Sequence, residues 1–331
     1  MGVSAAAAGS ASNDSNTLDP FYGLSFKVGV AENKNVAYRS KMEDVHTYIA
    51  NFAEQVDWGY FAIFDGHAGK ETARWCGNNL HNLLESEIAQ TCSNGDRRSK
   101  VLSGDIQQSF CEAFEKADEL IEKECTGSSG CTAAVAVLVW ERKEDTDIDE
   151  PMKSPGPEKE STPNAKQFEF IPTSNHKRVL YTSNVGDSRI VIYRDNKAYR
   201  LSYDHKATDL NEIARIRDTG GLILKSRVNG FLAVTRSLGD SYMKDLVVGR
   251  PFTTSLEISP TDEFIILACD GLWDVISDQK ACEFVTECFK SSKDPQRAAR
   301  LLCQLAMDEA TTDNVTVMIV RFDEDVFQLG I

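Results

Sequence analysis

The sequence predicts a mixed α and β domain in which an antiparallel-rich sheet core is flanked by helices. Three observations support this fold class. Short aromatic and β-branched runs recur along the chain, apolar residues at intervals of three and four lie between them, and the two kinds of segment do not alternate strictly. With 331 residues, of which 41% are hydrophobic, the chain can bury a sizeable core without covalent cross-links.

The beginning of the chain lacks the material for a fold. Residues 1–21 are mostly Ala, Ser, Gly and Asn with almost no large apolar groups, so they cannot offset their ordering entropy. We expect a disordered tail there. The first strand is expected over residues 24–30, where polar and apolar side chains alternate with a period of two.

Two apolar runs end in the same way and give the strongest strand signals. Residues 60–64 lead directly into Asp65, residues 264–269 lead directly into Asp270, and a glycine follows each aspartate. A carboxylate at the end of a buried strand is costly unless it is paired or bound to a metal ion. The two aspartates together predict one shared cation site.

The middle of the chain predicts a hairpin with a long connection. Residues 132–140 and 178–183 are strand-like, whereas residues 141–167 are rich in Asp, Glu, Lys, Pro and Ser. We expect a flexible acidic loop on the surface. Three aspartates in it have the spacing that opens an EF-hand, but Glu150 stands where the turn glycine is required, so calcium binding is not expected.

Helices are expected between the strands. Residues 71–88 and 106–125 carry apolar side chains at helical intervals. Asp209 and Glu212 have the spacing of a capping box at the start of a further helix. Asp294, which is followed by proline, is typical of the N-cap of a last helix.

Charge and hydropathy exclude several kinds of partner. A formal charge of −15 argues against nucleic acid and anionic membranes, since both repel an acidic surface. The ordinary explanation of such a charge is a solvated acidic face, and the alternative is acid gathered where cations bind. No apolar stretch is long enough to span a bilayer. Gly2 does not begin a myristoylation motif, because Ala6 replaces the required Ser or Thr.

Cysteine usage predicts the compartment. The nine cysteines are odd in number and scattered, with no C-x-x-C pair and no secretory signal before them. This pattern is typical of reduced thiols. We therefore expect a soluble protein of the cytoplasm and nucleus.

Acidic residues directly precede three further predicted strands, namely Asp187, Asp313 and the pair Glu43 and Asp44. One aspartate at a strand end is ordinarily a turn or cap residue. Five acidic strand ends favour a common site instead. Because the set offers oxygen ligands and no Cys or His ligand spacing, it points to Mg²⁺ or Mn²⁺.

Two such ions can activate one water molecule for attack on phosphorus. Arg39, four residues before Glu43, is a candidate for gripping phosphate oxygens, and a surface salt bridge is its alternative. His67 follows the Asp65-Gly66 strand end, and histidine changes charge near neutral pH, which suits it to protonate a leaving alkoxide. A hydrogen-bonded structural role is the alternative for His67. The signatures of aspartyl-phosphate, calcineurin-type, thiol and P-loop phosphohydrolases are missing from the sequence.

Eight motifs follow one another along the chain: R-S-K-M-E-D at 39–44, F-D-G-H-A-G at 64–69, S-G-C-T-A at 129–133, N-V-G-D-S-R at 184–189, D-H-K at 204–206, A-V-T-R-S-L-G-D at 233–240, A-C-D-G-L-W-D at 268–274 and T-D-N at 312–314. In their order and spacing they resemble the type 2C metal-dependent protein phosphatases over residues 26–322. The finer likeness is to small fungal members that dampen stress-responsive kinase cascades. One departure is Cys131, where many relatives have Ser or Thr.

The resemblance implies an α+β fold, a four-layer α/β/β/α sandwich of two antiparallel sheets flanked by helix pairs. It implies a single phosphatase catalytic domain over residues 22–325, with the loop at 141–167 as an insertion and a flap region at 205–245 beside the cleft. A monomer is expected.

The resemblance also implies the metal ligands. Asp65 would bridge two ions. Asp270 and Asp313 would hold the first ion, and Glu43 with the backbone carbonyl of Gly66 would hold the second.

Further roles are carried over in the same way. Asp44 would act through a metal-bound water. In family members with a third, weaker ion, the matching positions are Asp187 and Asp274. Arg39 would bind the substrate phosphate, and His67 would be the general acid.

The implied function is that of a protein serine/threonine phosphatase, which hydrolyses phosphoserine and phosphothreonine in one step and restrains stress or MAP kinase signalling. Its partners would be phosphorylated proteins, including kinases of such a cascade. Two alternatives stay open. A pseudophosphatase would need a broken metal set, whereas every expected ligand is present. The same machinery could also hydrolyse a small phosphometabolite.

Overall fold

The computed structural model describes residues 20–93, 103–125, 127–143 and 168–328. Nearly all of the expected tail at residues 1–21 and of the expected acidic loop at residues 141–167 lies outside these ranges. Both therefore stay predictions.

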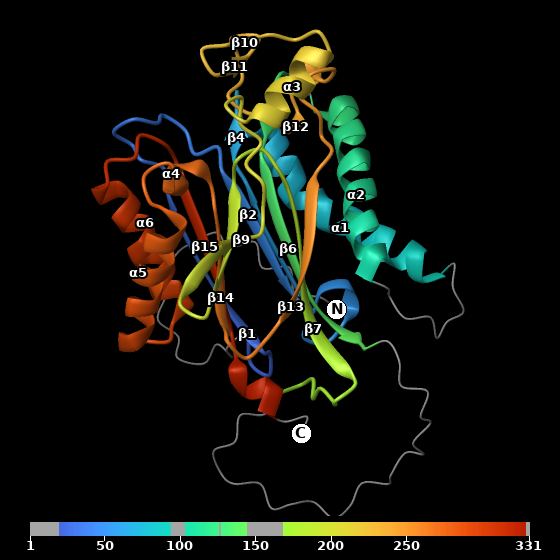
Figure 1. Cartoon of the computed structure of the whole chain (residues 1–331), viewed down its shortest axis with the longest axis vertical. Coiled ribbons are helices and arrows are strands. Elements are labelled where there is room, and N and C mark those ends of the chain that lie inside the picture. Colours follow the sequence, from blue (N-terminus) through green and yellow to red (C-terminus); the bar gives the residue numbers. More distant parts are fainter. Residues whose placement is uncertain (1–19, 94–102, 126, 144–167, 329–331) are drawn as a thin grey trace, which may run out of the picture.

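Two five-stranded sheets form the centre of the molecule (Figure 1). The first sheet has the order β1 (Phe26–Asn33), β15 (Val315–Phe322), β14 (Asp262–Ala268), β8 (Arg189–Arg194) and β9 (Lys197–Arg200). The second has the order β13 (Phe252–Ile258), β7 (His176–Val185), β6 (Ala133–Arg142), β3 (Gly59–Phe64) and β2 (Val45–Ala50). Every neighbouring pair in both sheets is antiparallel. The predicted mixed fold with antiparallel sheets is confirmed.

One apolar core lies between the two sheets. It joins Phe61 and Ile63 of β3 to Ile265, Leu267 and Met318 of the other sheet. The alternate residues of β3 point the opposite way, into a second core beneath helices. Burial on both faces explains why this strand is an uninterrupted apolar run in the sequence.

The predicted hairpin is confirmed by the pairing of β6 with β7. The register runs from Ala133 opposite Val185 to Arg142 opposite His176. Ten residue pairs at about 3.3 Å each make this ladder about 30 Å long. The connection after Arg142 therefore leaves from the end of the hairpin that is remote from Ala133.

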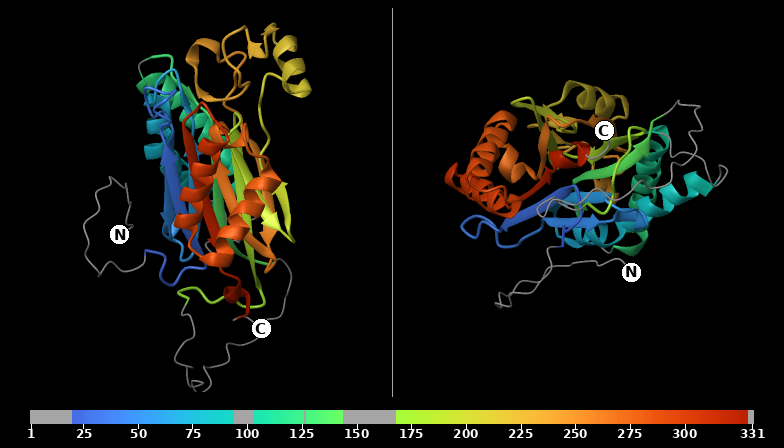
Figure 2. Two further views of the ribbon diagram at one scale, coloured as in Figure 1. Left: turned by 90° about the vertical axis from the view of Figure 1, so that its left-hand side faces the viewer. Right: turned by 90° about the horizontal axis from the view of Figure 1, so that it is seen from below.

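A helix pair covers the outer face of each sheet (Figures 1 and 2). Packing on the second sheet comes from α1 (Glu71–Ser93) and α2 (Ser103–Glu124). Packing on the first sheet comes from α5 (Asp278–Ser291) and α6 (Pro295–Asp308). Among the described helices, none is both long and apolar enough to cross a membrane.

Two predicted helix starts are confirmed by their N-caps. The Asp294 carboxylate accepts a hydrogen bond from the backbone N–H of Gln296 at 2.9 Å, at the start of α6. The Asp209 carboxylate accepts from the backbone N–H of Glu212 at 3.0 Å, at the start of α3 (Leu210–Asp218). The expected second half of the capping box is wrong, because the Glu212 side chain points elsewhere.

Glu212 instead anchors α3 to the segment that follows it in the chain. Its carboxylate accepts hydrogen bonds from Arg215 at 3.0 Å, from Arg236 at 2.7 Å and from the hydroxyl of Thr235 at 2.8 Å. Burial alone would raise the pKa of Glu212, but these donors outweigh it and lower the pKa to about 2. A buried ion pair that is broken on one side is costly, so this contact fixes the base of α3.

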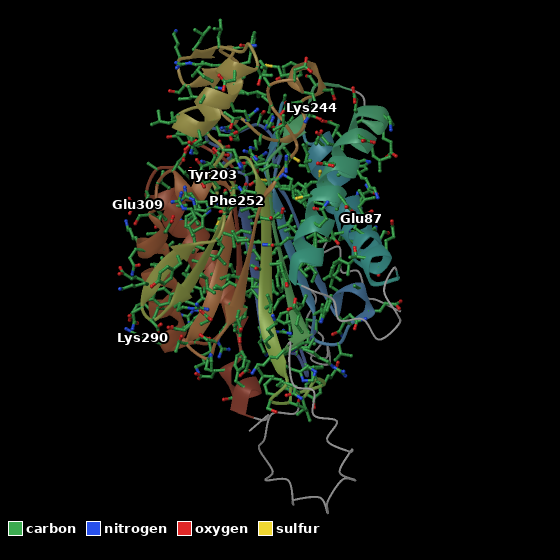
Figure 3. The ribbon with its side chains drawn as sticks, turned by 45° about the vertical axis from the view of Figure 1, so that its right-hand side comes forward. Glu87, Tyr203, Lys244, Phe252, Lys290 and Glu309 are labelled. Carbon is green, nitrogen blue, oxygen red and sulfur yellow. The ribbon has the colours of Figure 1, made fainter. Side chains whose placement is uncertain are left out.

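The expected flap region projects from one end of the sheets (Figures 1 and 2). It contains α3 and a short ribbon formed by β10 (Ile223–Leu224) and β11 (Arg227–Val228). Ile216 and Val247 belong to a small apolar core of its own. At its base the rings of Tyr203 and Phe252 lie 5.7 Å apart (Figure 3).

A small three-stranded sheet lies at the same end of the molecule. Its central strand is β5 (Gly130–Cys131), which pairs with β4 (Gly66–His67) on one side and β12 (Leu238–Gly239) on the other. Residues from three distant motifs therefore meet in one place.

Candidate metal centre

The acidic residues meet at the end of the sheets that carries the flap. Asp44 directly precedes β2, Asp65 lies between β3 and β4, Asp187 follows β7, and Asp313 precedes β15 with one residue between. Asp270 follows β14. The antiparallel order of the strands brings these five boundaries to the same edge.

Asp65 is at the centre of this group. Burial raises its pKa well above the usual value, and the charges of Asp44, Asp270, Asp187 and Asp313 raise it further. The carboxylates that the sequence placed in one site thus lie close enough to repel one another.

Asp44 lies deepest. Its carboxylate accepts a hydrogen bond from the hydroxyl of Thr316 at 2.7 Å. Burial raises its pKa to about 6 against the lowering effect of hydrogen bonds from Thr316 and Cys269. Ligand atoms of Asp44, Asp65 and Cys269 all lie within 4.8 Å of one another. No sequence pattern had identified Thr316, which is a polar residue within the buried apolar run at the start of β15.

Asp270 corrects the expectation of a carboxylate at a strand end. Strand β14 stops at Ala268, and Asp270 is the first residue of the short helix α4 (Asp270–Trp273). Helix α4 packs closely on the chain before β15, because a Cβ on Gly271 would lie 1.9 Å from the carbonyl oxygen of Asn314. Burial raises the pKa of Asp270 well above its usual value, as do nearby acidic groups.

Asp187 and Asp274 share a basic partner that the sequence did not predict. The ammonium of Lys206 lies 3.3 Å from the Asp187 carboxylate and 2.8 Å from that of Asp274. Burial alone would lower the pKa of Lys206, but the two carboxylates raise it overall. Membership of the D-H-K motif was the one signal that could have identified this residue.

Arg39 lies at the rim of the site and pairs with Asp313. Its Nε also donates to the carbonyl oxygen of Thr312 at 3.2 Å. The salt bridge that was its alternative role is thus present, and its partner is one of the predicted metal ligands. The side chain remains 45% exposed, so the guanidinium is open to a ligand.

Glu43 is positioned through its backbone. Its N–H donates to the side-chain carbonyl of Asn314 at 2.9 Å, and the amide of Asn314 donates to the backbone carbonyls of Lys34 and Lys41. No hydrogen bond or ion pair joins the Glu43 carboxylate to another described residue. Asn314 therefore ties the Arg39–Glu43 segment to the strand that carries Asp313.

The hydrogen-bond partner of His67 lies outside the set of predicted metal ligands. Its Nε2 lies 2.7 Å from a carboxylate oxygen of Asp240, whose side chain is 0% exposed. The imidazole itself is 27% exposed. Asp240 had been noted only as the last residue of its motif.

The donor set fits a hard divalent cation. Among the described residues, no basic side chain forms an ion pair with Asp44, Asp65 or Asp270. Crowded carboxylates of this kind need an external positive charge. Burial, followed by the charges of Asp44 and Asp65, raises the pKa of the Cys269 thiol well above its usual value, so it stays neutral and is a poor ligand. The site therefore suits Mg²⁺ or Mn²⁺.

Comparisons with known proteins agree with this geometry. The family model described as "Protein phosphatase 2C" matches residues 28–143 and 170–315. The protein named "Protein phosphatase 2C homolog 1" of Saccharomyces cerevisiae is 48% identical over 299 residues, which cover 90% of this chain and 94% of that protein. A protein of the same name from Schizosaccharomyces pombe is 38% identical, with 88% of this chain and 72% of that protein covered.

A solved structure supports the fold. The crystal structure of serine-threonine phosphatase 2C from Toxoplasma gondii has a TM-score of 0.65 and 20% identity, and the likeness covers 90% of this chain and 95% of that one. At this identity the likeness concerns the fold alone.

Proposed function

We propose a mechanism and a cellular role for this chain, which belongs to the protein phosphatase 2C family and is a metal-dependent protein serine/threonine phosphatase that acts on phosphorylated proteins. One observation carries the mechanism. Asp44, Asp65 and Asp270 lie together with raised pKa values and no ion pair to a basic side chain among the described residues, while Arg39 and His67 stand beside them.

Two ions would be held at this edge. Asp65 would help to hold both ions, which its place among the charges of Asp44, Asp270, Asp187 and Asp313 supports. Asp270 and Asp313 would hold the first ion, and Glu43 and the Gly66 carbonyl would hold the second. When bound, Mg²⁺ or Mn²⁺ lowers the pKa of a water molecule so that it attacks phosphorus in a single displacement, without a covalent phosphoenzyme.

The side chains around the ions bind and orient the substrate. Arg39 would bind two phosphate oxygens with its planar guanidinium, and Asp313, which now pairs with Arg39, would be available as a metal ligand. His67 donates a proton to the departing serine or threonine oxygen. Asp44, fixed by the hydroxyl of Thr316, accepts a hydrogen bond from the attacking water.

A third, weaker ion would bind between Asp187 and Asp274, next to Asp270. The support is that these two carboxylates already enclose a cation, the ammonium of Lys206. An ion would have to displace it. This competition accounts for weak binding at the third site.

We further infer a single catalytic domain over residues 22–325 with the four-layer sandwich of its family. The core between the two sheets and the helix pairs on their outer faces support this arrangement. The cellular role rests on the likeness to small fungal members. It is the removal of phosphate from kinases of a stress or MAP kinase cascade, by a monomer in the cytoplasm and nucleus.

The test compares phosphothreonine and phosphotyrosine peptides with and without Mn²⁺. The expected result is rapid hydrolysis of the phosphothreonine peptide that requires Mn²⁺ and little hydrolysis of the phosphotyrosine peptide. Turnover without added metal in the presence of a chelator would contradict the mechanism. Binding of the peptide without turnover would identify a pseudophosphatase, and a preference for small phosphate esters over both peptides would identify a metabolite phosphatase.

A further inference from the structure

We propose that Asp240 is a positioning residue that holds the imidazole of His67 by its Nε2 and so directs Nδ1 toward the leaving group. This inference rests on the proposed role of His67 as general acid. Asp240 does not touch the substrate in this proposal. It acts by holding Nε2, which fixes Nδ1 as the ring nitrogen that faces the reaction.

The hydrogen bond between the two side chains is shielded from water. Nε2 of His67 lies 2.7 Å from Oδ2 of Asp240, and the Asp240 side chain is 0% exposed. A carboxylate only accepts hydrogen bonds, so Nε2 is the donor and carries the hydrogen. Nδ1 is then the nitrogen left for the substrate. It can donate a proton to the leaving oxygen when the ring carries a hydrogen on both nitrogens, and after that step the hydrogen on Nε2 remains.

Stability alone does not explain a carboxylate at this position. The other partner of Oδ2 is the neutral hydroxyl of Ser237 at 2.5 Å, and Oδ1 has no hydrogen-bond partner among the described residues. A buried carboxylate with a free oxygen is costly. An amide or an apolar side chain would cost less, which points to a functional reason for Asp240.

The backbone is shaped around this pair. In the small sheet, Gly130 lies opposite both His67 and Gly239. A Cβ on Gly130 would lie 2.1 Å from Oδ2 of Asp240 and 2.5 Å from Nε2 of His67, so only glycine permits the contact. Asp240 itself adopts a left-handed φ of 50°, and its N–H donates to the carbonyl of Ser129 at 3.1 Å.

The pair has the chemistry of a buried carboxylate that orients a catalytic histidine. Such a carboxylate fixes the tautomer and ring orientation and stabilises the protonated imidazole. Without it the ring is free to turn about its side-chain bonds and to present either nitrogen. The loss should therefore fall on the chemical step and spare substrate binding.

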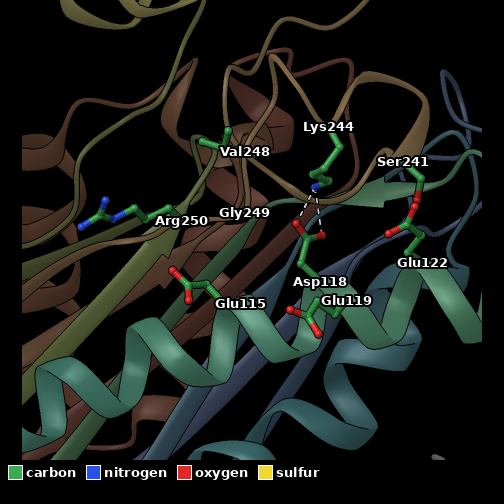
Figure 4. A pocket seen from close by; sticks show the side chains of 9 residues that line it. All are labelled: Glu115, Asp118, Glu119, Glu122, Ser241, Lys244, Val248, Gly249 and Arg250. Carbon is green, nitrogen blue, oxygen red and sulfur yellow. Dashed lines mark hydrogen bonds and ion pairs between the residues drawn. The ribbon is translucent and has the colours of Figure 1, made fainter.

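Asp118 on α2 provides a matched control. Its carboxylate accepts from the backbone N–H of Gly239 at 2.9 Å and from the ammonium of Lys244 at 2.9 Å, in the polar cleft of Figure 4. It thus supports the same segment as Asp240 without touching His67. Asp118→Asn keeps the shape and an accepting oxygen, and we expect wild-type kinetics.

The experiment joins a spectroscopic and a kinetic readout. Long-range ¹H–¹⁵N spectra of the Mg²⁺-loaded protein, assigned with His67→Gln, should show His67 with its hydrogen on Nε2. Asp240→Asn and Asp240→Ala should lose this fixed tautomer. Both should lower kcat for a phosphothreonine peptide on the order of 100-fold with KM nearly unchanged. An activated aryl phosphate, whose leaving group needs no proton, should lose much less.

The outcomes distinguish a failure of the Asp240 positioning role from a failure of the proposed acid role of His67. Asp240→Asn with wild-type thermal stability, an unchanged tautomer and an unchanged kcat would overturn the positioning role. If His67→Gln loses peptide and aryl phosphate turnover equally, the acid role of His67 itself fails. A selective loss in His67→Gln that Asp240→Asn and Asp240→Ala do not share overturns the inference and leaves the proposed function intact.

Discussion

The predicted metal ligands form two groups that differ in the source of the positive charge that offsets their carboxylates. Among the described residues, no basic side chain forms an ion pair with the inner carboxylates, Asp44, Asp65 and Asp270, although the charge of Lys206 also acts on Asp270. Burial raises the pKa of each of the three. The outer pair, Asp187 and Asp274, encloses the ammonium of Lys206. The inner group therefore depends on an external cation, whereas the outer pair has its cation within the chain.

The difference comes from Lys206 and not from the placement of the carboxylates. Asp187 follows β7 just as the inner carboxylates adjoin β2, β3 and β14, so the core fixes the positions of all of them. Lys206 belongs to the flap region, and its ammonium reaches Asp187 and Asp274. A flexible lysine can give way to an ion, but a crowded carboxylate group cannot relax.

The largest expected effect comes from removing one inner charge. Asp270→Asn should lower Mn²⁺-dependent turnover of a phosphothreonine peptide by at least about 1,000-fold, since the activated water depends on the ions. Asp274→Asn, in the outer pair, should lower it by less than about tenfold. Steady-state kinetics measure the turnover of both variants, and circular dichroism is the control for folding. Near-normal turnover by Asp270→Asn would show that activity does not depend on ions held by the inner carboxylates.

Removal of the metal should make stability depend on pH through the inner carboxylates. The pKa of Asp44 is raised from 3.8 to about 6 in the folded protein, so the unfolded state loses its proton first as pH rises. The metal-free protein should lose about 2 kcal/mol from this group between pH 4 and pH 7. Saturating Mn²⁺ should suppress the loss. Urea unfolding at both pH values, with and without a chelator, measures it, and equal metal-free stabilities would contradict the account.

The outer pair should bind an ion more tightly once its lysine is gone. Lys206→Met should strengthen the weakest Mn²⁺ site on the order of tenfold, or about 1.4 kcal/mol, because no ammonium competes for it. Lys206→Arg keeps the charge and serves as the control. Calorimetric titration of both variants gives the affinities. A Lys206→Met protein with wild-type binding at every site would show that the ammonium does not compete.

The smallest effect is expected from a change in the segment that joins β6 to β7. Deletion of residues 145–165, which lie outside the described structure, should alter aryl phosphate hydrolysis less than about twofold. The loop is connected to the hairpin end at Arg142 and His176, and the opposite end of that ladder, at Ala133 and Val185, adjoins the acidic edge. Initial-rate measurements of aryl phosphate hydrolysis test this expectation. A collapse of activity would show that the loop is part of the active domain.

The sequence predicted features that depend on neighbouring residues. The buried run before Asp65 and the N-cap at Asp294 were both predicted from a few adjacent side chains, and both are present. The acidic residues were grouped because each lay beside a strand. Antiparallel pairing then brings such boundaries together without further information.

What the sequence did not predict depends on contacts between distant segments. Lys206 meets Asp274 across 68 residues, and Asp240 meets His67 across 173 residues. Glu212 had the spacing of a capping box, but Arg236 offers its carboxylate a stronger partner than a backbone N–H. The spacing of residues along the chain does not indicate such partners from distant segments.

The most direct test of the central claim is a count of bound Mn²⁺ by electron paramagnetic resonance at controlled free metal. We expect two tightly held ions in the wild-type protein and in Asp274→Asn, and fewer in Asp270→Asn. If Asp274→Asn loses as many tightly held ions as Asp270→Asn does, the inner and outer carboxylates form one site and the distinction drawn between them is wrong.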